Sequence, residues 1–189
     1  AVVLDKSTKA DDIKLVDTDI PKIKKGWVLI KIKSFGLNHS EKLLREFEIE
    51  YDYINKPIIP GIECAGVVVE SLDNDFKIND TVISFMGGLG RSFNGSYAEY
   101  ALAPKTHTFK VDINLTFEEL GAVPETYYTA WGSLFESLDL KKDDTLLIRG
   151  ATSALGYVSI QIAKAVGAKV IATKYKESKL NLLNEADEK

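Results

Sequence analysis

The pattern of apolar and polar positions divides the chain into a strand-like first part and a second part in which strands and helices alternate. Apolar and polar residues alternate over residues 27–33, and short apolar runs recur at 65–69, 81–85 and 97–103. Segments rich in Gly, Pro, Asn and Asp separate these runs, as short strands joined by turns require. We therefore expect a compact β-rich barrel over residues 1–115, with one short helix inserted over residues 40–50.

Residues 116–189 carry helical spacing around two short apolar strands. Thr116 and Glu119 have the spacing of a capping box, so a helix begins after Thr116, and another is expected over residues 126–138, after the break at Pro124. Residues 145–148 and 170–172 are expected to be buried strands. The helix between them follows from Leu155, Val158, Ile162 and Val166, and Gly167 closes it. A last helix is expected over residues 178–184.

A strand, a helix and a strand within about 30 residues form a βαβ unit with parallel strands and a right-handed crossover. Two strands do not make an independently stable sheet, because three or more are normally needed. The fold class expected is therefore α/β, with a β-rich barrel followed by an incomplete, doubly wound parallel sheet over residues 116–189. The chain is expected to be the front part of a longer enzyme.

Composition and charge exclude several classes of protein. The 189 residues are 45% hydrophobic and 28% charged, which is typical of a folded globular protein and not of a disordered one. The net charge is −4 and no basic block is dense enough to bind nucleic acid. A single cysteine, Cys64, indicates a reducing compartment, and with His39 and His107 it is too little for a structural zinc site. Without a long apolar run or a leader, we expect a cytoplasmic protein that does not enter a membrane.

The turn between the strand at 145–148 and the following helix is a candidate anion site, because backbone N–H groups and the helix dipole face outward there. It does not match G-x-G-x-x-G, so a turn built only for packing remains the alternative. Thr152 and Ser153 have hydroxyls for capping or for a phosphate, and Gly156 lets the helix lie close to the strand. The candidate diphosphate-binding residues are Gly150, Ala151, Thr152, Ser153, Ala154, Leu155 and Gly156.

The end of the second strand bears on which cofactor is bound. NAD-selective sites usually carry an acidic residue there, about 20 residues beyond the glycine turn. This chain has Thr173 and Lys174, followed by Lys176 and Lys179, so a 2′-phosphate would meet positive charge and NADPH is favoured. The alternative is that these lysines form the solvated face of the next helix.

Five segments together resemble the medium-chain dehydrogenase/reductase superfamily, in its zinc-free quinone oxidoreductase-like branch. The resemblance covers nearly all of the chain and implies a GroES-like barrel followed by the start of a Rossmann domain. The segments are residues 28–38, Pro60-Gly61-Ile62-Glu63 with Ala65-Gly66-Val67-Val68, residues 95–100, Pro124-Glu125 with Thr129-Ala130-Trp131, and the turn at 150–156.

The resemblance also implies that this chain lacks the catalytic zinc site found in other members of the superfamily. Zinc-dependent alcohol dehydrogenases of the superfamily hold their catalytic metal with a Cys and with the His of a Gly-His-Glu motif. Asn38 and Ile62 stand at those positions, and neither side chain is a suitable zinc ligand. The structural-zinc lobe with its four cysteines is also missing. We therefore expect no zinc, with His39 a loop or cleft residue.

Roles for individual residues follow from the same resemblance. Asn38 and Thr129 would bond the nicotinamide-ribose end of the cofactor, the 150–156 turn its diphosphate, and Thr173 with Lys179 its 2′-phosphate end. For Asn38, a turn amide that bonds its own backbone is the alternative. Leu43 stands where some relatives have an active-site tyrosine and Ser153 where a glycine is usual. This leaves Tyr51 and Tyr53 as weak candidates for proton delivery, against a role in aromatic packing beside Pro57 and Pro60.

The function expected is an NADPH-dependent, zinc-independent oxidoreductase that transfers hydride to a quinone or an α,β-unsaturated carbonyl, with the 189-residue chain inactive alone. The alternatives are an enoyl-thioester reductase of the same superfamily and a non-catalytic binding module. A homodimer is expected for the full-length protein.

Overall fold

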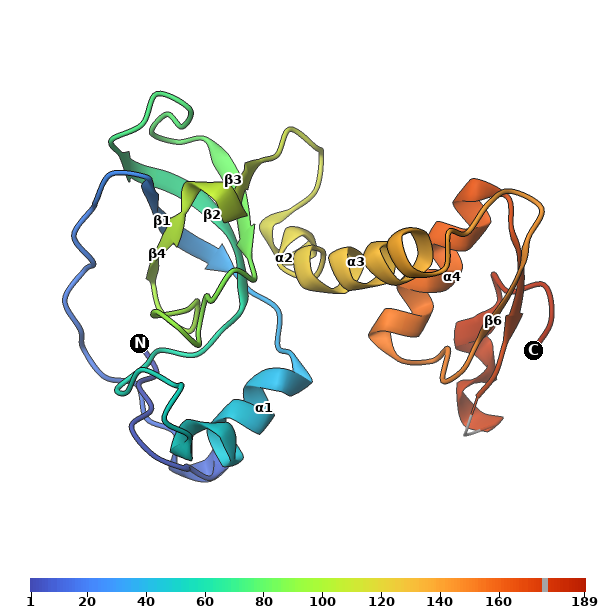
Figure 1. The fold of residues 1–189 in the computed structure, drawn as a ribbon, viewed down its shortest axis with the longest axis horizontal. Helices are drawn as coiled ribbons and strands as arrows, with labels where there is room; N and C mark the ends of the chain where they lie inside the picture. The colour runs from blue at the N-terminus through green and yellow to red at the C-terminus, as the bar shows by residue number, and fades with distance from the viewer. Residues whose placement is uncertain (175–176) are drawn as a thin grey trace. The chain divides into compact units, whose positions relative to one another are not determined.

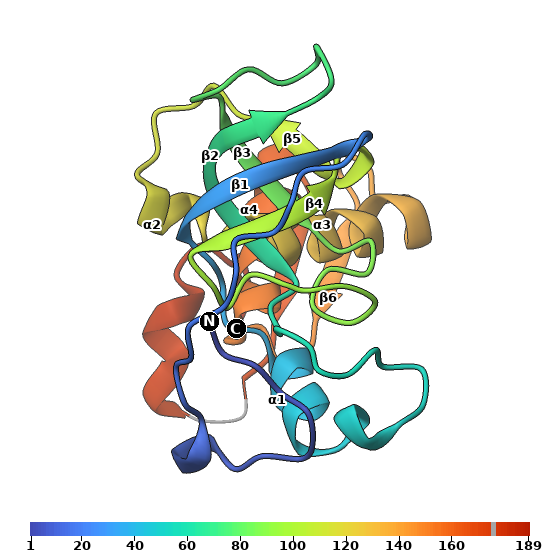
Figure 2. The same cartoon turned by 90° about the vertical axis from the view of Figure 1, so that its left-hand side faces the viewer.

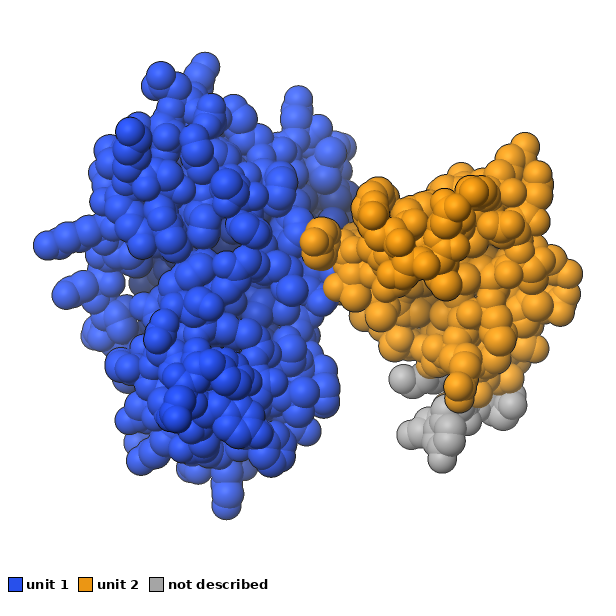
Figure 3. Space-filling model, in the orientation of Figure 1, with its two compact units in different colours: residues 1–125 blue, residues 126–189 orange. Residues whose placement is uncertain are grey.

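The computed structural model describes residues 1–174 and 177–189, which form two compact units, residues 1–125 and residues 126–189 (Figures 1 and 3). The first unit contains a curled antiparallel sheet, and the second contains a parallel pair of strands with its helices. This is the mixed α/β architecture expected from the sequence.

The sheet of the first unit has five strands in the order β4-β1-β2-β3-β5, and every neighbouring pair is antiparallel. Figure 2 shows the curl of these strands. The strands are β1 (Trp27–Ser34), β2 (Glu63–Ser71), β3 (Thr81–Phe85), β4 (Tyr100–Pro104) and β5 (Thr108–Lys110). Val28 and Ile30 of β1 are fully buried and belong to one apolar cluster with Val68 of β2 and Val82 of β3. Burial of this apolar face holds the sheet together.

Strand β3 has the expected bounds, but β4 begins three residues later than the expected strand over 97–103. The difference has a local cause, since Tyr97 bonds to loops rather than to a strand. Its N–H donates to the carbonyl of Pro60, and its carbonyl accepts from the N–H of Val2.

Helical segments supply a second, smaller core. The expected helix over 40–50 is divided into α1 (His39–Glu46) and a 3-10 turn, η2 (Glu48–Glu50). Leu44 and Ile49 from these two segments are fully buried, and they pack with Leu4, Ile54 and Ile58. The first unit also contains two further 3-10 turns, η1 (Ala10–Asp12) and η3 (Lys105–His107).

The first unit extends to Glu125, ten residues beyond the boundary expected after Leu115. The short helix α2 (Phe117–Leu120) begins at the expected capping box, where Glu119 N–H donates to Thr116 Oγ1 at 3.2 Å. Ser34 Oγ donates to the carbonyl of Phe117, which ties α2 back to β1. Residues 116–125 therefore belong to the same compact unit as the barrel.

Helix α3 (Pro124–Trp131) begins at Pro124 itself, whereas the sequence predicted a break there. Proline is well suited to the first helical position, because the N–H that it lacks would have no intrahelical partner. A π-helical segment, η4 (Gly132–Ser137), follows directly, so the helical stretch predicted over 126–138 is present but not regular.

The second unit contains the predicted βαβ arrangement. Strands β6 (Thr145–Ile148) and β7 (Lys169–Ala172) are parallel, and α4 (Ala154–Val166) connects them. Gly167 follows α4 with φ of 86°, the left-handed cap that the sequence predicted. The segment expected as a helix over 178–184 is the 3-10 helix η5 (Glu177–Leu183). In the described part of the chain, no helix combines the length and the apolar character that crossing a membrane requires.

Candidate functional site

Asn38 lies at the start of α1, where two buried carboxylates hold it. Its backbone N–H donates to Glu41 Oε2 at 2.8 Å, and its side-chain Nδ2 donates to Glu63 Oε1 at 2.8 Å. Glu41 is 4% exposed and Glu63 is 2% exposed. The amide of Asn38 is thus bonded to a side chain 25 residues further along the chain, in addition to the local capping box that Asn38 forms with Glu41 at the start of α1.

Both carboxylates accept further hydrogen bonds from the surrounding framework. Glu63 Oε2 accepts from the backbone N–H of Glu125 at 2.8 Å, in the first turn of α3. Glu41 Oε1 accepts from the N–H of Ile62 at 3.0 Å, and Tyr97 donates its hydroxyl proton to Glu41 Oε2 at 2.5 Å. Buried carboxylates need such partners, because an unpaired buried charge is strongly destabilising.

The protonation of these groups follows from their burial. Burial raises the pKa of the Glu63 carboxyl, against the bonds from Asn38 and Glu125, which lower it. Burial, followed by the hydrogen bond to Glu41, also raises the pKa of Tyr97 far above its ordinary value. Tyr97 therefore stays protonated throughout the physiological pH range, and its hydroxyl donates a hydrogen bond to Glu41.

We expect Glu63→Gln to change how stability depends on pH. A carboxyl whose pKa is higher in the folded than in the unfolded state contributes stability at low pH, and this contribution is lost as the pH rises through the folded pKa. The glutamine side chain has the same shape and carries no charge. It can accept from the N–H of Glu125, and it can donate to Asn38 when the Asn38 amide turns its oxygen toward position 63. Urea unfolding of both proteins at a series of pH values from the unfolded pKa of a glutamate upward should show the free energy of unfolding of Glu63→Gln rising relative to the wild type. A difference that stays constant with pH would contradict the raised pKa.

The two tyrosines considered for proton delivery lie on the surface. Tyr51 is 54% exposed and Tyr53 is 64% exposed, and their ring centroids are 5.6 Å apart. They pack against each other, and neither lines the cavity beside Asn38. Cys64 is fully buried in β2, and burial raises the pKa of its thiol to about 12, so it is a structural residue and not a nucleophile.

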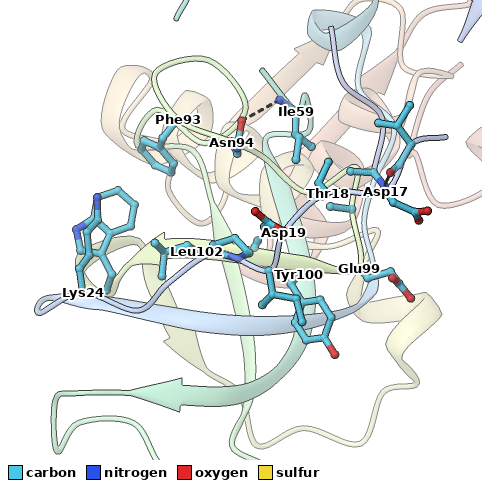
Figure 4. A pocket seen from close by; sticks show the side chains of 17 residues that line it. Asp17, Thr18, Asp19, Lys24, Ile59, Phe93, Asn94, Glu99, Tyr100 and Leu102 are labelled. Atoms are coloured by element: carbon cyan, nitrogen blue, oxygen red, sulfur yellow. Dashed lines mark hydrogen bonds between the residues drawn. The ribbon is translucent and has the colours of Figure 1, made fainter. Parts of the chain in front are cut away.

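Several cavities lie in the first unit, and two of similar size are compared as candidate sites. One of about 290 Å³ is lined by Leu37, Asn38, Glu41 and Tyr97. The other, of about 270 Å³, lies between the segment 16–24 and β4 (Figure 4). Asn94, which accepts from the N–H of Ile59 at 3.0 Å, stands at its wall. Because this second cavity includes neither Asn38 nor its carboxylates, we assign the candidate site to the first.

The turn that precedes α4 presents a group of unpaired backbone amides. Ser153 is the N-cap of α4, and its Oγ accepts from the N–H of Gly156 at 3.1 Å. Within the described residues, the N–H groups of Thr152, Ala154 and Leu155 have no hydrogen-bond partner. Unpaired amides at a helix N-terminus, together with the helix dipole, favour an anion such as a diphosphate.

The remaining candidate cofactor residues lie in the second unit. The N–H of Gly150 donates to Thr173 Oγ1 at 3.3 Å, and that of Ala151 to the carbonyl of Thr173 at 3.0 Å. Lys174 follows Thr173 and is half-buried. Thr129 lies in α3, where its carbonyl accepts from Ser133 Oγ at 2.8 Å. The side chain of Lys179 lies outside the described residues.

Metal-ligating side chains do not cluster in the described ranges, since no three His, Cys, Asp or Glu residues there are arranged to hold an ion. By the resemblance described above, zinc-dependent alcohol dehydrogenases carry metal ligands at the positions that Asn38 and Ile62 occupy in this chain. Ile62 is 6% exposed, and its side chain offers no donor atom.

Sequence reasoning missed Glu41, Glu63 and Tyr97 as parts of the site. Two signals were present: Glu41 stands three residues after Asn38, the spacing of a capping box, and Glu63 ends the motif Pro60-Gly61-Ile62-Glu63. The role of Tyr97 depends on a contact across 56 residues, which no local pattern predicts.

Comparison with known proteins assigns the family. Residues 24–113 match the alcohol dehydrogenase GroES-like domain. A human quinone oxidoreductase is 34% identical over 162 residues, which is 83% of this chain and 46% of that protein.

Solved structures agree with this assignment. One described as an NAD-dependent alcohol dehydrogenase is 29% identical, with a TM-score of 0.89 over 100% of this chain and 62% of its own. A mycobacterial protein described as complexed with NADPH is 26% identical, with a TM-score of 0.85 over 100% of this chain and 55% of its own.

The chain spans about half the length of the quinone oxidoreductases that it matches. The match to the GroES-like domain covers the first unit's sheet, and the structural likeness extends over the second unit as well. The chain therefore belongs to the medium-chain dehydrogenase/reductase superfamily and has quinone oxidoreductases among its homologues.

Proposed function

We propose that the whole protein is an NADPH-dependent, zinc-independent oxidoreductase that reduces a quinone or an α,β-unsaturated carbonyl. The observation that carries the proposal is the turn before α4, in a chain homologous to quinone oxidoreductases. Among the residues that the structure describes, the amides of Thr152, Ala154 and Leu155 in this turn have no partner. A Cβ at Gly156 would lie 2.6 Å from Ala151 Cα, so the close turn depends on glycine. These residues fit a dinucleotide diphosphate.

Each unit has a separate task in this proposal. The second unit holds the dinucleotide by its diphosphate, with the loop amides as donors and the positive end of α4 behind them. The bound cofactor supplies the hydride. In the first unit, Asn38 is fixed by Glu63 and offers an oriented amide beside the cavity of about 290 Å³. Such preorganised polar groups position a reacting ligand without reorganisation.

The preference for NADPH rests on charge. Thr173 and Lys174 follow the end of β7, where NAD-selective proteins carry an acidic residue, and neither of them is acidic. A relative of 26% identity is described as a complex with NADPH, whereas another of 29% identity is described as NAD-dependent. The charge at the end of β7 therefore favours NADPH.

The proposal is tested with the whole protein, NADPH, NADH and two acceptors. We expect NADPH to protect the protein from thermal unfolding more strongly than NADH, and NADPH to be oxidised when a simple quinone or an enone is added. Binding without oxidation of the cofactor would favour a module that keeps the fold for binding alone. Absence of both binding and oxidation would remove the proposed function.

A further inference from the structure

Thr173 forms hydrogen bonds with the end of β6 and with the start of the loop between β6 and α4, through both its backbone and its side chain. Its N–H donates to the carbonyl of Ile148 at 2.9 Å, and its carbonyl accepts from Ala151 N–H at 3.0 Å. These two bonds lie directly beyond the last paired residues of β6 and β7, Ile148 and Ala172. The side-chain Oγ1 also accepts from Gly150 N–H at 3.3 Å and donates to the carbonyl of Ile148 at 3.4 Å.

The hydroxyl bonds matter because of the conformation of Gly150. This residue has φ of +67°, the left-handed region that glycine adopts without a steric cost. Its N–H is directed to the end of β7, and Thr173 Oγ1 is its acceptor there. The two longer bonds of the hydroxyl are thus the side-chain link between the strand end and the point at which the chain turns toward α4.

The hydrogen bonds within this turn determine which of its backbone N–H groups are left to bind a ligand. The N–H groups of Gly150 and Ala151 both donate to Thr173, and that of Gly156 donates to Ser153 Oγ. The N–H of Ser153 donates to the carbonyl of Gly150 at 3.1 Å. Of the described loop residues between Gly150 and Gly156, this leaves the amides of Thr152, Ala154 and Leu155 unpaired.

We propose that Thr173 is a positioning residue that holds Gly150, and so sets the loop geometry in which the three unpaired amides bind a diphosphate. This inference rests on the proposed dinucleotide function. It differs from the expectation that Thr173 contacts the 2′-phosphate, because the hydroxyl is already engaged on both its donor and its acceptor side.

The two roles predict different nucleotide selectivities. NADPH and NADH share the diphosphate and differ in the 2′-phosphate. Thr173→Val keeps the shape and removes the hydroxyl. If Thr173 positions the loop, this variant weakens both nucleotides by the same factor, about fivefold, as expected for the loss of a long hydrogen bond. If Thr173 binds the 2′-phosphate, NADPH alone is weakened.

The measurement is the dissociation constant of NADPH and of NADH for the whole protein, by fluorescence titration. Thr173→Ser keeps the hydroxyl and should restore both affinities. Lys174→Gln is the matched comparison, since removal of a cation near the 2′-phosphate should weaken NADPH and spare NADH. A selective loss of NADPH in Thr173→Val, unchanged binding of both nucleotides, or a Thr173→Ser variant as weak as Thr173→Val would each overturn the inference.

A second measurement separates this inference from the proposed function. Without any nucleotide, the Gly150 amide should exchange its proton faster in Thr173→Val than in the wild type, and at the wild-type rate in Thr173→Ser. If the wild type binds neither nucleotide, the proposed function fails, and the exchange rates still report whether Thr173 holds Gly150. Equal exchange in the wild type and Thr173→Val would end the positioning role.

Discussion

Gly156→Ala is expected to lower the affinity for a pyridine dinucleotide by about 100-fold, because the new methyl group has no space in the turn before α4. Its Cβ would lie 2.6 Å from Cα, 2.8 Å from C and 2.9 Å from O of Ala151. All three atoms belong to the backbone, so relief requires the loop itself to open. Opening separates the amides of Thr152, Ala154 and Leu155, which is why binding is affected more than folding.

Gly132→Ala is the matched control for this substitution. In the part of the chain that the structure describes, nothing lies within 4 Å of a Cβ at Gly132, which stands in a helical segment. Alanine there should be neutral or stabilise by about 0.5–1 kcal/mol. Titration of both variants with NADPH, alongside thermal unfolding, checks the expectation. Wild-type affinity in Gly156→Ala would show that the loop does not carry the diphosphate.

Gly36→Ala is expected to destabilise the first unit by about 2–3 kcal/mol, because it forces a buried carboxylate from its place. The added Cβ would overlap Glu63 Oε1 and lie 2.9 Å from Glu63 Cδ. Glu63 cannot move aside without losing its bonds to Asn38 and to the N–H of Glu125. Urea unfolding measures the loss, and the activity of the whole protein should fall with it, because Asn38 loses its fixed orientation.

A double-mutant cycle identifies the cause of this loss. Glu63→Ala removes the group that the new methyl meets, so Gly36→Ala should cost clearly less in that background than in the wild type. Glu63→Gln keeps the volume, so Gly36→Ala should cost about as much there as in the wild type. If the substitutions at positions 36 and 63 are additive in both backgrounds, the clash with Glu63 is not the cause.

Elements with strong local signals were predictable from the sequence. The capping box at Thr116 and Glu119, the apolar strand β6, and the helix that ends at Gly167 are each specified by neighbouring residues, and all three are confirmed. The order of a β-rich part followed by a βαβ unit is likewise confirmed, because it depends on periodicity that each segment carries by itself.

Features that depend on distant partners were not predictable in the same way. The division after Glu125 reflects hydrogen bonds that tie residues 116–125 to β1 and β2, such as that from Glu125 to Glu63. The start of β4 and the role of Tyr97 likewise follow from long-range contacts. For Thr173, the sequence identified an important position, but the bond to Gly150 becomes visible only when β7 lies beside the loop.

We propose that the whole protein reduces its substrate with a pyridine dinucleotide and without zinc. The most direct test measures NADPH oxidation with a quinone by the whole protein, together with its zinc content, before and after treatment with a strong chelator. We predict substoichiometric zinc and a rate that the chelator leaves unchanged. One zinc ion held per chain, with activity lost when it is removed and regained when it is added back, would contradict the claim.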